Sequence, residues 1–440
     1  MHARPRGTRR LAAAVGGPLL GVAALGATLA TTTPAAGAPG TAPAATNERV
    51  ALVNETDEQP DAESALNGTA QVTSHDGRYV VFSTEAALVP HDDNGILDVY
   101  LRDTGDGHTV LVSERRGRPG NDYSHEPTIS ADGRYVAFTT WATDLVRSDS
   151  NGHDLDVVVK DMQTGTIERV SVDSRERQRG RNSFAPVISG NGRYVSFQTF
   201  GAFGPRDQDR KEDVYVRDLR RGTTRQASLL PGSNRDVRGP VLNGDISDDG
   251  RIVAFGYNDN IWVRDMAAGK TVRVHHEEGP PQCFPQQPTP SAGRPVVSGD
   301  GRFVAFSSCA EELPGASTNG TDIWRVSLRS GAITRVTAGD DHSYLPSLSR
   351  TGRFVGFGSD ATDLVRGDDE GMPDAFVADL RNDTVVRASE TADGTGGDSW
   401  SATFDVAISG DGRSLAYATY ADNLVPGVKY DWHEVLVWRR

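Results

Sequence analysis

The sequence predicts an all-β fold, a seven-bladed β-propeller of four-stranded antiparallel blades, and three observations lead to this prediction. One short motif recurs seven times along the chain. Each copy has three further strand-like segments around it, which gives four candidate strands per unit. The last unit lacks its fourth strand, and a matching segment stands before the first unit.

The repeated motif is Asp-Gly-Arg, or a close variant, followed by an apolar run. Its seven copies are residues 76–82 (DGRYVVF), 132–138 (DGRYVAF), 191–197 (NGRYVSF), 249–255 (DGRIVAF), 300–306 (DGRFVAF), 351–357 (TGRFVGF) and 411–417 (DGRSLAY). Their glycines are 51 to 60 residues apart. A period of this length is typical of architectures in which each repeat is one supersecondary unit.

The strand-like segments are short, rich in β-branched and aromatic residues, and bounded by Gly, Asp, Asn and Pro. The first ends in Ser just before the motif, as in residues 127–130 (PTIS), and the motif carries the second. The copies of the third are residues 98–103, 156–161, 213–218, 260–265, 322–327, 374–379 and 434–439. The fourth is seen at residues 166–172, 271–275 and 332–337. Asp-Gly suits a two-residue hairpin turn, and no segment has a helical period, so each unit is predicted to be a propeller blade.

The sequence also contains a strand that would close the ring. Residues 434–439 (EVLVWR) are the third strand of the seventh unit, and the chain ends at Arg440. Residues 48–54 (ERVALVN) resemble fourth strands such as residues 168–173 (ERVSVD), yet they precede the first motif. We therefore expect the N-terminal strand to complete the last blade.

These repeats, of the form PxISxDGRYVAF followed by DVYVRDxxTGxTxRVS, resemble the TolB-like, WD-repeat-like propeller family over residues 48–440. The resemblance implies a platform for protein interactions, as in periplasmic translocation complexes, or a propeller fused to a peptidase domain. We expect no fused domain in this chain. Because one fold serves both binders and enzymes, the resemblance does not choose between them.

Residues 1–46 are predicted to be a signal peptide and low-complexity leader, and residues 47–440 to form the propeller. The leader begins with four arginines, continues with an uncharged apolar stretch at residues 11–30, and ends in Ala, Pro and Thr. No later apolar run is long enough for an integral membrane segment. We therefore expect a secreted protein, either extracellular or in the cell envelope.

The chain is acidic. The leader holds four of the 46 basic residues and no acidic one, which leaves 42 basic against 60 acidic residues and a net charge near −18. This charge argues against nucleic acid or an anionic membrane as partner. We expect a monomer that binds a protein or a cell-wall or extracellular polymer.

The chain has two cysteines, Cys283 and Cys309. In an oxidising compartment the simplest expectation for such a pair is a disulfide. A catalytic or metal-binding thiol is the alternative.

The strand order places the longer loops on one face of the predicted ring. This long-loop face carries the loops between second and third strands and the connections between blades, where binding is common. The second-to-third loop at residues 92–98 has the spacing D-x-N-G-x-x-D, which resembles the core of a calcium loop, and related acidic loops occur at residues 149–156, 207–213 and 368–374. The candidate metal ligands are Asp92, Asn94, Asp98, Asp149, Asn151, Asp156, Asp368 and Asp374. The alternative is that these side chains only form self-bonded turns.

Aromatic and histidine residues also gather at the ends of the first and second strands. The candidate binding residues are Tyr123, His125, Trp141, His342, Tyr344 and Trp400. Around the mouth of the central channel they would form a platform for a peptide or sugar. The alternative is packing between blades, and the recurrence of Phe184, Tyr344 and Phe404 at one aligned position favours it for these three.

An arginine-rich connection at residues 175–181 (RERQRGR) follows Arg115, Arg116 and Arg118 in the previous connection. Such groups can bind carboxylate or phosphate, as on an anionic wall polymer. A solvated loop is the alternative.

The predicted function is a secreted, non-catalytic binding propeller that uses its long-loop face. The sequence contains neither a G-x-S-x-G elbow nor an H-E-x-x-H motif. The alternative is a metal-dependent lyase or hydrolase at the channel mouth, with His125 and Asp245 or Asp405 as metal ligands. Calcium is the one cofactor that the residues suggest, and enzymatic activity stays open.

Overall fold

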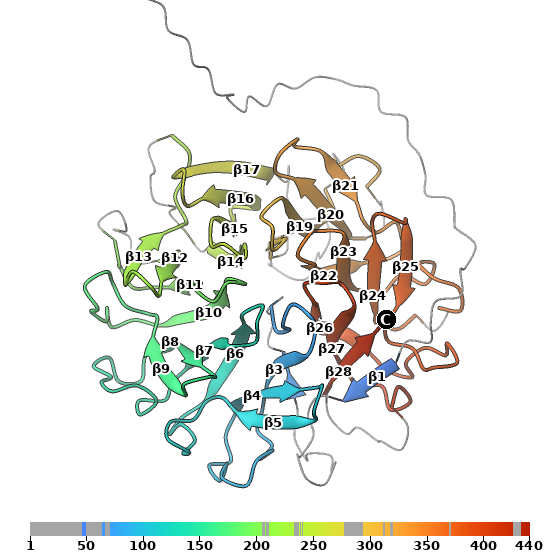
Figure 1. The fold of residues 1–440 in the computed structure, drawn as a ribbon. Helices are drawn as coiled ribbons and strands as arrows, with labels where there is room; N and C mark the ends of the chain where they lie inside the picture. Colours follow the sequence, from blue (N-terminus) through green and yellow to red (C-terminus); the bar gives the residue numbers. More distant parts are fainter. Residues whose placement is uncertain are drawn as a thin grey trace, which may run out of the picture. The chain divides into compact units, whose positions relative to one another are not determined.

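The computed structural model describes residues 46–49, 64–66, 71–204, 207, 211–232, 237, 239, 241–276, 294–310, 313–316, 320–368, 371–425 and 433–440. These residues form seven four-stranded antiparallel sheets arranged around a central opening (Figure 1). The predicted seven-bladed propeller is therefore confirmed. Among the described residues, no helix has the length and apolar character needed to cross a membrane.

The blades follow one another along the chain, and in each the first strand lies innermost. Blade 1 contains β2 (Ser64–Ala65), β3 (Tyr79–Thr84), β4 (Asp98–Asp103) and β5 (His108–Leu111). Blade 2 contains β6 (Ser124–Ile129), β7 (Tyr135–Thr140), β8 (Asp156–Asp161) and β9 (Thr166–Arg169). Blade 3 contains β10 (Ser183–Ile188), β11 (Tyr194–Thr199), β12 (Asp213–Asp218) and β13 (Thr223–Gln226). Blade 4 contains β14 (Val241–Ile246), β15 (Ile252–Tyr257), β16 (Asn260–Asp265) and β17 (Lys270–His276).

The remaining three blades repeat this order. Blade 5 contains β18 (Val296–Val297), β19 (Phe303–Ser308), β20 (Asp322–Ser327) and β21 (Ile333–Arg335). Blade 6 contains β22 (Ser343–Leu348), β23 (Phe354–Ser359), β24 (Asp374–Asp379) and β25 (Thr384–Arg387). Blade 7 contains β26 (Ser401–Ile408), β27 (Ser414–Thr419), β28 (Glu434–Arg439) and the N-terminal strand β1 (Thr46–Arg49).

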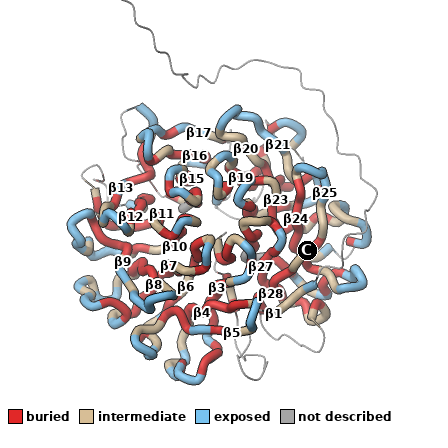
Figure 2. Tube along the Cα trace, in the orientation of Figure 1, coloured by how far each residue is buried: buried red, intermediate tan, exposed pale blue. Residues whose placement is uncertain are grey.

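The core lies between the blades. Second and third strands such as β3 and β4 are buried at nearly every position, because neighbouring blades cover both faces of each sheet. The outer strand β5 alternates between exposed and buried residues. Figure 2 shows the same division between a buried interior and exposed outer loops. The last residue of every motif is a fully buried aromatic: Phe82, Phe138, Phe197, Phe255, Phe306, Phe357 and Tyr417.

The motif is a hairpin turn that also ties the second strand to the third. In blade 2, Ser130 Oγ donates to Asp132 Oδ1 at 2.6 Å and accepts from the Tyr135 N–H at 2.9 Å. Arg134 forms two parallel bonds to Asp161 at the end of β8, at 3.0 and 2.7 Å. The same two-pronged pair recurs as Arg78–Asp103, Arg193–Asp218 and Arg353–Asp379.

The motif glycine also provides the contact between adjacent blades. Gly192 has a φ of 67°, and a Cβ atom there would lie 2.4 Å from the ring of Tyr135 in the preceding blade. The equivalent close contacts are Gly133 with Tyr79, Gly250 with Tyr194, Gly352 with Phe303 and Gly412 with Phe354. The turn and the approach of the aromatic ring therefore both require a residue without a side chain.

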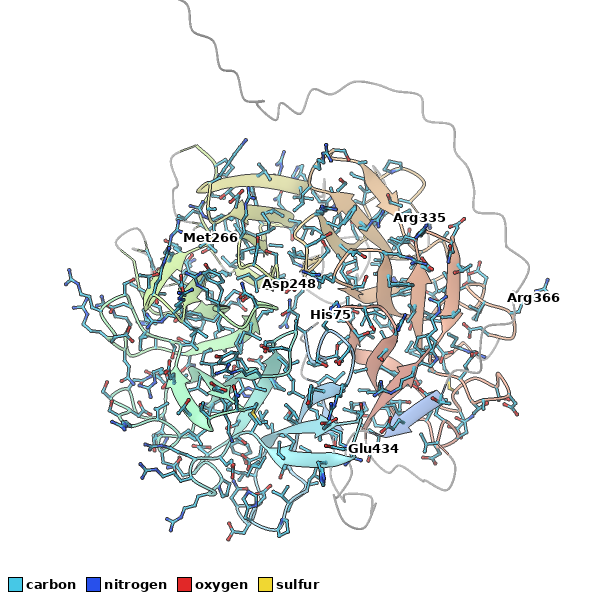
Figure 3. All side chains as sticks on the ribbon, viewed as in Figure 1. His75, Asp248, Met266, Arg335, Arg366 and Glu434 are labelled. Carbon is cyan, nitrogen blue, oxygen red and sulfur yellow. The ribbon has the colours of Figure 1, made fainter. Side chains whose placement is uncertain are left out.

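A closed ring of backbone hydrogen bonds joins the blades on the face that carries the motif turns. Each bond runs from the residue just before a motif, or from the motif's first residue, to the blade that follows. The donor–acceptor pairs are His75–Ala131, Ala131–Gly190, Asn191–Asp248, Asp248–Gly299, Asp300–Arg350, Arg350–Gly410 and Asp411–His75, at 2.8 to 3.0 Å. Figure 3 places His75 and Asp248 beside the central opening.

The N-terminal strand closes the last blade, as the strand count predicts. β1 pairs antiparallel with β28, with Thr46 opposite Arg439. Asn47 accepts a hydrogen bond from the Tyr417 hydroxyl at 2.9 Å, and its amide donates to the Glu390 carbonyl of blade 6 at 2.8 Å. The described strand is residues 46–49, and residues 50–63 lie outside the described part of the chain, as do residues 1–45 of the predicted leader.

Candidate functional site

Three of the predicted binding residues occupy equivalent places on the long-loop face. Tyr123, His342 and Trp400 each stand just before the innermost strand of their blade. The carbonyl of each accepts a hydrogen bond at 2.9 Å from the N–H of the residue that follows the second strand. Those donors are Trp141, Asp360 and Tyr420. The inner strands line the central opening, so these three residues, from blades 2, 6 and 7, lie at its mouth.

Two of these three side chains are strongly exposed. Tyr123 is 44% exposed and Trp400 53% exposed. The other exposed large hydrophobic residues in the described part of the chain are aliphatic and lie on outer strands: Val110, Val272 and Ile333. The exposed aromatic surface of the described propeller is therefore concentrated on the long-loop face.

Blade 2 brings three predicted binding residues into contact. The rings of His125 and Trp141 are stacked, with centroids 5.1 Å apart and planes at 13°. Tyr123 meets the same Trp141 edge-on at 6.3 Å. His125 Nδ1 is buried and has no hydrogen-bond partner among the described residues. We call Tyr123, His125 and Trp141 the blade 2 cluster.

Tyr344 and His342 have bonds within the scaffold. Tyr344 aligns with His125, and its hydroxyl donates to Asp360 Oδ1 at 2.7 Å. Burial, together with the Asp360 carboxylate, raises the pKa of this tyrosine. His342 Nδ1 lies 3.0 Å from the Thr321 N–H of blade 5. These contacts favour the packing interpretation for Tyr344, whereas the side chain of Phe404 lies outside the described residues.

The predicted metal ligands of blades 2 and 6 surround an arginine instead of an open site. Arg169 Nη2 lies 3.4 Å from Asp149 and 2.9 Å from Asp156. Arg387 Nη1 lies 3.4 Å from both Asp368 and Asp374. Because each carboxylate pair already holds a buried cation, the structure corrects the metal prediction for these two loops. The correction covers Asp149, Asn151, Asp156, Asp368 and Asp374.

The aspartates at the start of the third strands have a structural role that the sequence analysis missed. Asp156 accepts a hydrogen bond from Ser171 Oγ at 2.7 Å, and the same hydroxyl receives the Val157 N–H at 3.3 Å. The pairs Ser113–Asp98, Ser228–Asp213 and Ser389–Asp374 repeat this contact. The signal is a serine 15 residues after the aspartate in these four blades.

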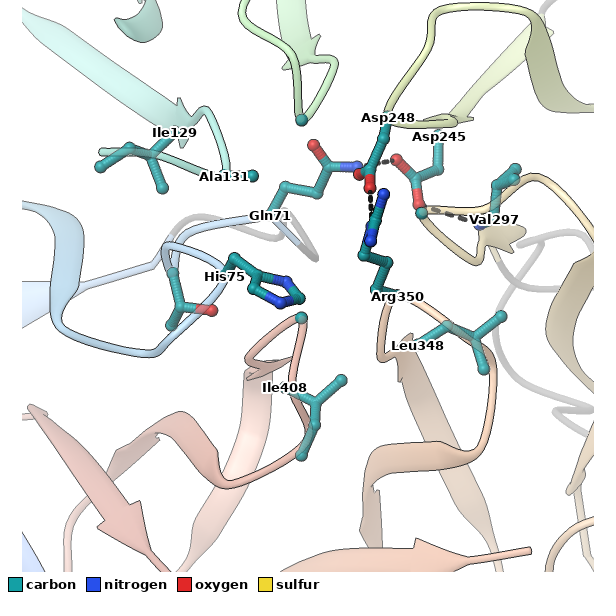
Figure 4. A pocket seen from close by; sticks show the side chains of 14 residues that line it. Gln71, His75, Ile129, Ala131, Asp245, Asp248, Val297, Leu348, Arg350 and Ile408 are labelled. Atoms are coloured by element: carbon teal, nitrogen blue, oxygen red, sulfur yellow. Dashed lines mark hydrogen bonds and ion pairs between the residues drawn. The ribbon is translucent and has the colours of Figure 1, made fainter. Parts of the chain in front are cut away.

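The channel is constricted on the motif-turn face by polar side chains (Figure 4). Asp245 Oδ1 accepts from Gln71 Nε2 at 2.8 Å, which links blades 4 and 1 across the channel. Asp245 Oδ2 accepts from the Val297 N–H at 2.9 Å. Arg350 Nε lies 2.7 Å from Asp248 Oδ2. The remaining cavity of about 60 Å³ has room for a few waters and is far below the volume of ordinary ligand pockets.

These channel residues do not fit a divalent metal. Asp245 already accepts three N–H donors, and Asp248 pairs with a guanidinium. His125 lies three aligned positions nearer the long-loop face than Asp245, and two blades away. No group of three or more His, Cys, Asp or Glu side chains suited to a metal occurs within the described ranges. The side chain of Asp405 lies outside them.

Asp245 makes stability depend on pH. Burial raises its pKa to about 7, so the folded state binds more protons than the unfolded state between about pH 4 and pH 7. The contribution of Asp245 to the free energy of unfolding therefore falls as pH rises through this window and levels off above it. Between pH 5 and pH 7.5, the unfolding free energy of the wild type is expected to change by on the order of 2 kcal/mol more, in the downward direction, than that of Asp245→Asn. Urea unfolding of the wild type and of Asp245→Asn at both pH values checks this prediction. The same change in unfolding free energy in the two proteins would contradict it.

Two larger hollows flank the arginine-rich connection. One has a volume of about 810 Å³ and the other about 590 Å³, both within the range of ligand sites. Their walls contain Arg115, Arg116, Arg147, Arg169, Arg175, Arg177, Arg179, Arg217, Arg225 and Arg264. Several of these already pair with acids, as Arg177 and Arg179 do with Asp173. We call the two hollows the arginine groove.

Of the two cysteines, Cys309 follows β19. Cys283 lies outside the described residues, so the disulfide stays a prediction.

Comparisons with known proteins support the fold. No protein-family model matches the sequence, and no curated protein matches it. Similar solved structures include an oligogalacturonate lyase in complex with manganese, 14% identical over 90% of this chain and 96% of that one, with a TM-score of 0.54. The β-propeller domain of the Trilobed protease from Pyrococcus furiosus is 10% identical over 86% and 95%, with a TM-score of 0.50. TolB from Acinetobacter baumannii is 12% identical over 83% and 81%, with a TM-score of 0.40. At these identities the likeness to the first two structures establishes the β-propeller fold and nothing finer.

Proposed function

We propose that this chain is a secreted or envelope-located binding module, without catalysis of its own, that binds a protein or polymer through its long-loop face. The observation that carries the proposal is the pair of exposed aromatics, Tyr123 and Trp400, at equivalent places around the channel mouth. Exposed aromatic side chains gain much free energy when a partner covers them.

The loops that present these aromatics are held in place before any partner arrives. Asn121 donates to Thr143 Oγ1 at 2.9 Å and accepts from the Thr143 N–H at 2.9 Å. In blades 6 and 7 the equivalent backbone N–H donates to an aspartate side chain. Thr362 donates to Asp340 Oδ1 at 2.9 Å, and Asp422 to Asp398 Oδ1 at 2.8 Å. A pre-organised loop loses little conformational entropy on binding, which favours a recognition surface.

The blade 2 cluster supplies the most detailed part of this surface. Tyr123 and Trp141 offer aromatic area, and His125 Nδ1 is a polar atom still without a hydrogen bond among the described residues. Apolar area with a few polar atoms that orient the ligand is the usual composition of a binding site.

Replacing Tyr123 and Trp400 together with alanine is expected to weaken partner capture at least tenfold. The test compares retention of purified cell-wall polymers and secreted proteins by immobilised wild type and by the double variant. Val272→Ala with Ile333→Ala is the matched control, because it removes exposed apolar area on outer strands. Equal capture by wild type and the aromatic variant would overturn the assignment of the surface.

The arginine groove is a second candidate surface, favoured by its volume and charge. It suits an anionic polymer, whose binding would weaken with added salt. Arg115→Ala, Arg116→Ala and Arg147→Ala in one chain separate the two surfaces. Loss of capture in this variant alone, with strong salt dependence, would place the partner in the groove.

A lyase function finds no support in the described channel residues. The manganese-bound oligogalacturonate lyase shares the fold, but Asp245, Asp248 and His125 do not form a metal site here. Incubation with uronate polymers and added manganese tests the point directly. The appearance of unsaturated, ultraviolet-absorbing products would overturn the non-catalytic proposal.

A further inference from the structure

One position in the blades decides whether the buried aspartate at the start of the third strand has an arginine partner. This position lies on the fourth strand of a blade. Its residue pairs with the third residue of the neighbouring third strand. Arginine occupies it in blades 2, 5 and 6, paired with Val158, Trp324 and Phe376 respectively. In each case the guanidinium reaches the aspartate at the start of the third strand, at 2.9 to 3.4 Å.

Blade 1 has leucine at this position. Leu111 lies opposite Tyr100 in the same register. Asp98 is fully buried and Asp92 is 7% exposed, yet neither has an ion pair within the described part of the chain. Burial, with a contribution from the charge of Asp92, raises the pKa of Asp98 to about 6. Blade 1 thus keeps the acidic pair of blades 2 and 6 and lacks their arginine.

The hydrogen bonds of blade 1 leave one carboxylate oxygen open. Asp98 accepts from Ser113 Oγ and, at 2.7 Å, from Asn94 Nδ2. Asp92 Oδ2 accepts from the Tyr100 hydroxyl. Asp92 Oδ1 is buried and has no hydrogen-bond partner among the described residues. A buried, unpaired carboxylate oxygen is costly, so this atom needs a proton or a cation.

We propose that the acidic loop of blade 1 binds one calcium ion through Asp92 and Asp98, where blades 2, 5 and 6 place an arginine and blade 3 a glutamine. The ligands nearby are carboxylate and amide oxygens, which suit a hard cation. Asn94 Nδ2 faces Asp98 and its Oδ1 accepts from the Ile96 N–H at 3.1 Å, so the amide must rotate to present its oxygen to an ion. Gly95, with a φ of 66°, provides the turn in the loop. The ion is a structural one, in a loop that contacts the start of β6 through the bond from the Ser124 N–H to the Leu97 carbonyl.

The experiment is calcium binding and thermal unfolding of the full chain. After chelator treatment, titration with calcium chloride is expected to give about one bound ion per chain, and calcium to raise the Tm by several degrees over EGTA. Leu111→Arg supplies the missing cation within the protein. This variant is expected to lose calcium binding and to melt in EGTA at or above the wild-type temperature.

The controls separate the site from general effects of charge. Val110→Arg adds the same charge at the neighbouring exposed position and should keep the calcium response. Asp92→Asn should lose it, and Arg169→Leu should create a second response in blade 2. If the wild type binds no calcium and melts at the same temperature in calcium and in EGTA, the proposal is overturned. Asp92 and Asp98 would then share a proton instead. A response that survives in Leu111→Arg and Asp92→Asn would overturn it as well.

Discussion

Leucine in place of Arg387 is expected to lower the free energy of unfolding by about 3–5 kcal/mol, measured by urea unfolding in the presence of chelator. The Arg387 side chain is 1% exposed and lies 3.4 Å from Asp368 and Asp374. Burial already raises the pKa of Asp374 to about 7 with the arginine in place. Without it, two buried carboxylates face each other with no cation, so they must take up a proton or draw in water.

Two variants make this result specific. Arg381→Leu removes an exposed arginine of the same blade and should change stability by no more than about 0.5 kcal/mol. Adding Asp368→Asn and Asp374→Asn to Arg387→Leu removes the stranded charges and should restore much of the loss. If Arg387→Leu is as stable as Arg381→Leu, the guanidinium does not neutralise the pair.

Gly192→Ala is expected to cost about 2–4 kcal/mol of stability. One part is the left-handed backbone, which costs an alanine roughly 1 kcal/mol relative to glycine. The larger part is the new Cβ atom, 2.4 Å from the ring of Tyr135. That ring is held between blades, and overpacking a filled interface costs about 1–3 kcal/mol. Thermal or urea unfolding of the variant provides the value.

Gly165→Ala is the matched control for this substitution. Its φ of 69° nearly equals that of Gly192, but a Cβ atom there meets nothing within 4 Å. The difference between the two variants therefore isolates the contact with the neighbouring blade. Equal losses would show that the tyrosine ring moves aside freely and that the motif glycine serves only the turn.

The sequence predicts the architecture because its signals are local and repeated. The Asp-Gly turns and apolar runs such as residues 135–140 are each visible within a few neighbouring residues. Counting their copies gives the seven blades. The closing strand is found by counting, although it pairs with residues at the other end of the chain. Its start differs by two residues, since Thr46 already pairs with Arg439.

The sites were harder to predict because their partners lie on other strands. The acidic loops have a calcium-like spacing, and only an arginine 13 residues after Asp156 or Asp374 shows that the cation is internal. That spacing is visible in the sequence once the register is known. The bond from Gln71 to Asp245 spans 174 residues and crosses the channel, so no local pattern indicates it.

The closing strand makes blade 7 the junction between the two ends of the ring. In every other blade the four strands follow one another along the chain, whereas β1 and β28 are held together by pairing alone. Within the described residues, four pairs form this junction, from Thr46 with Arg439 to Arg49 with Leu436. Joining segments 393 residues apart costs about 2 kcal/mol more chain entropy than closing a 30-residue hairpin. We therefore expect the local blades to form first and the ring to be sealed last, by the pairing of β1 with β28.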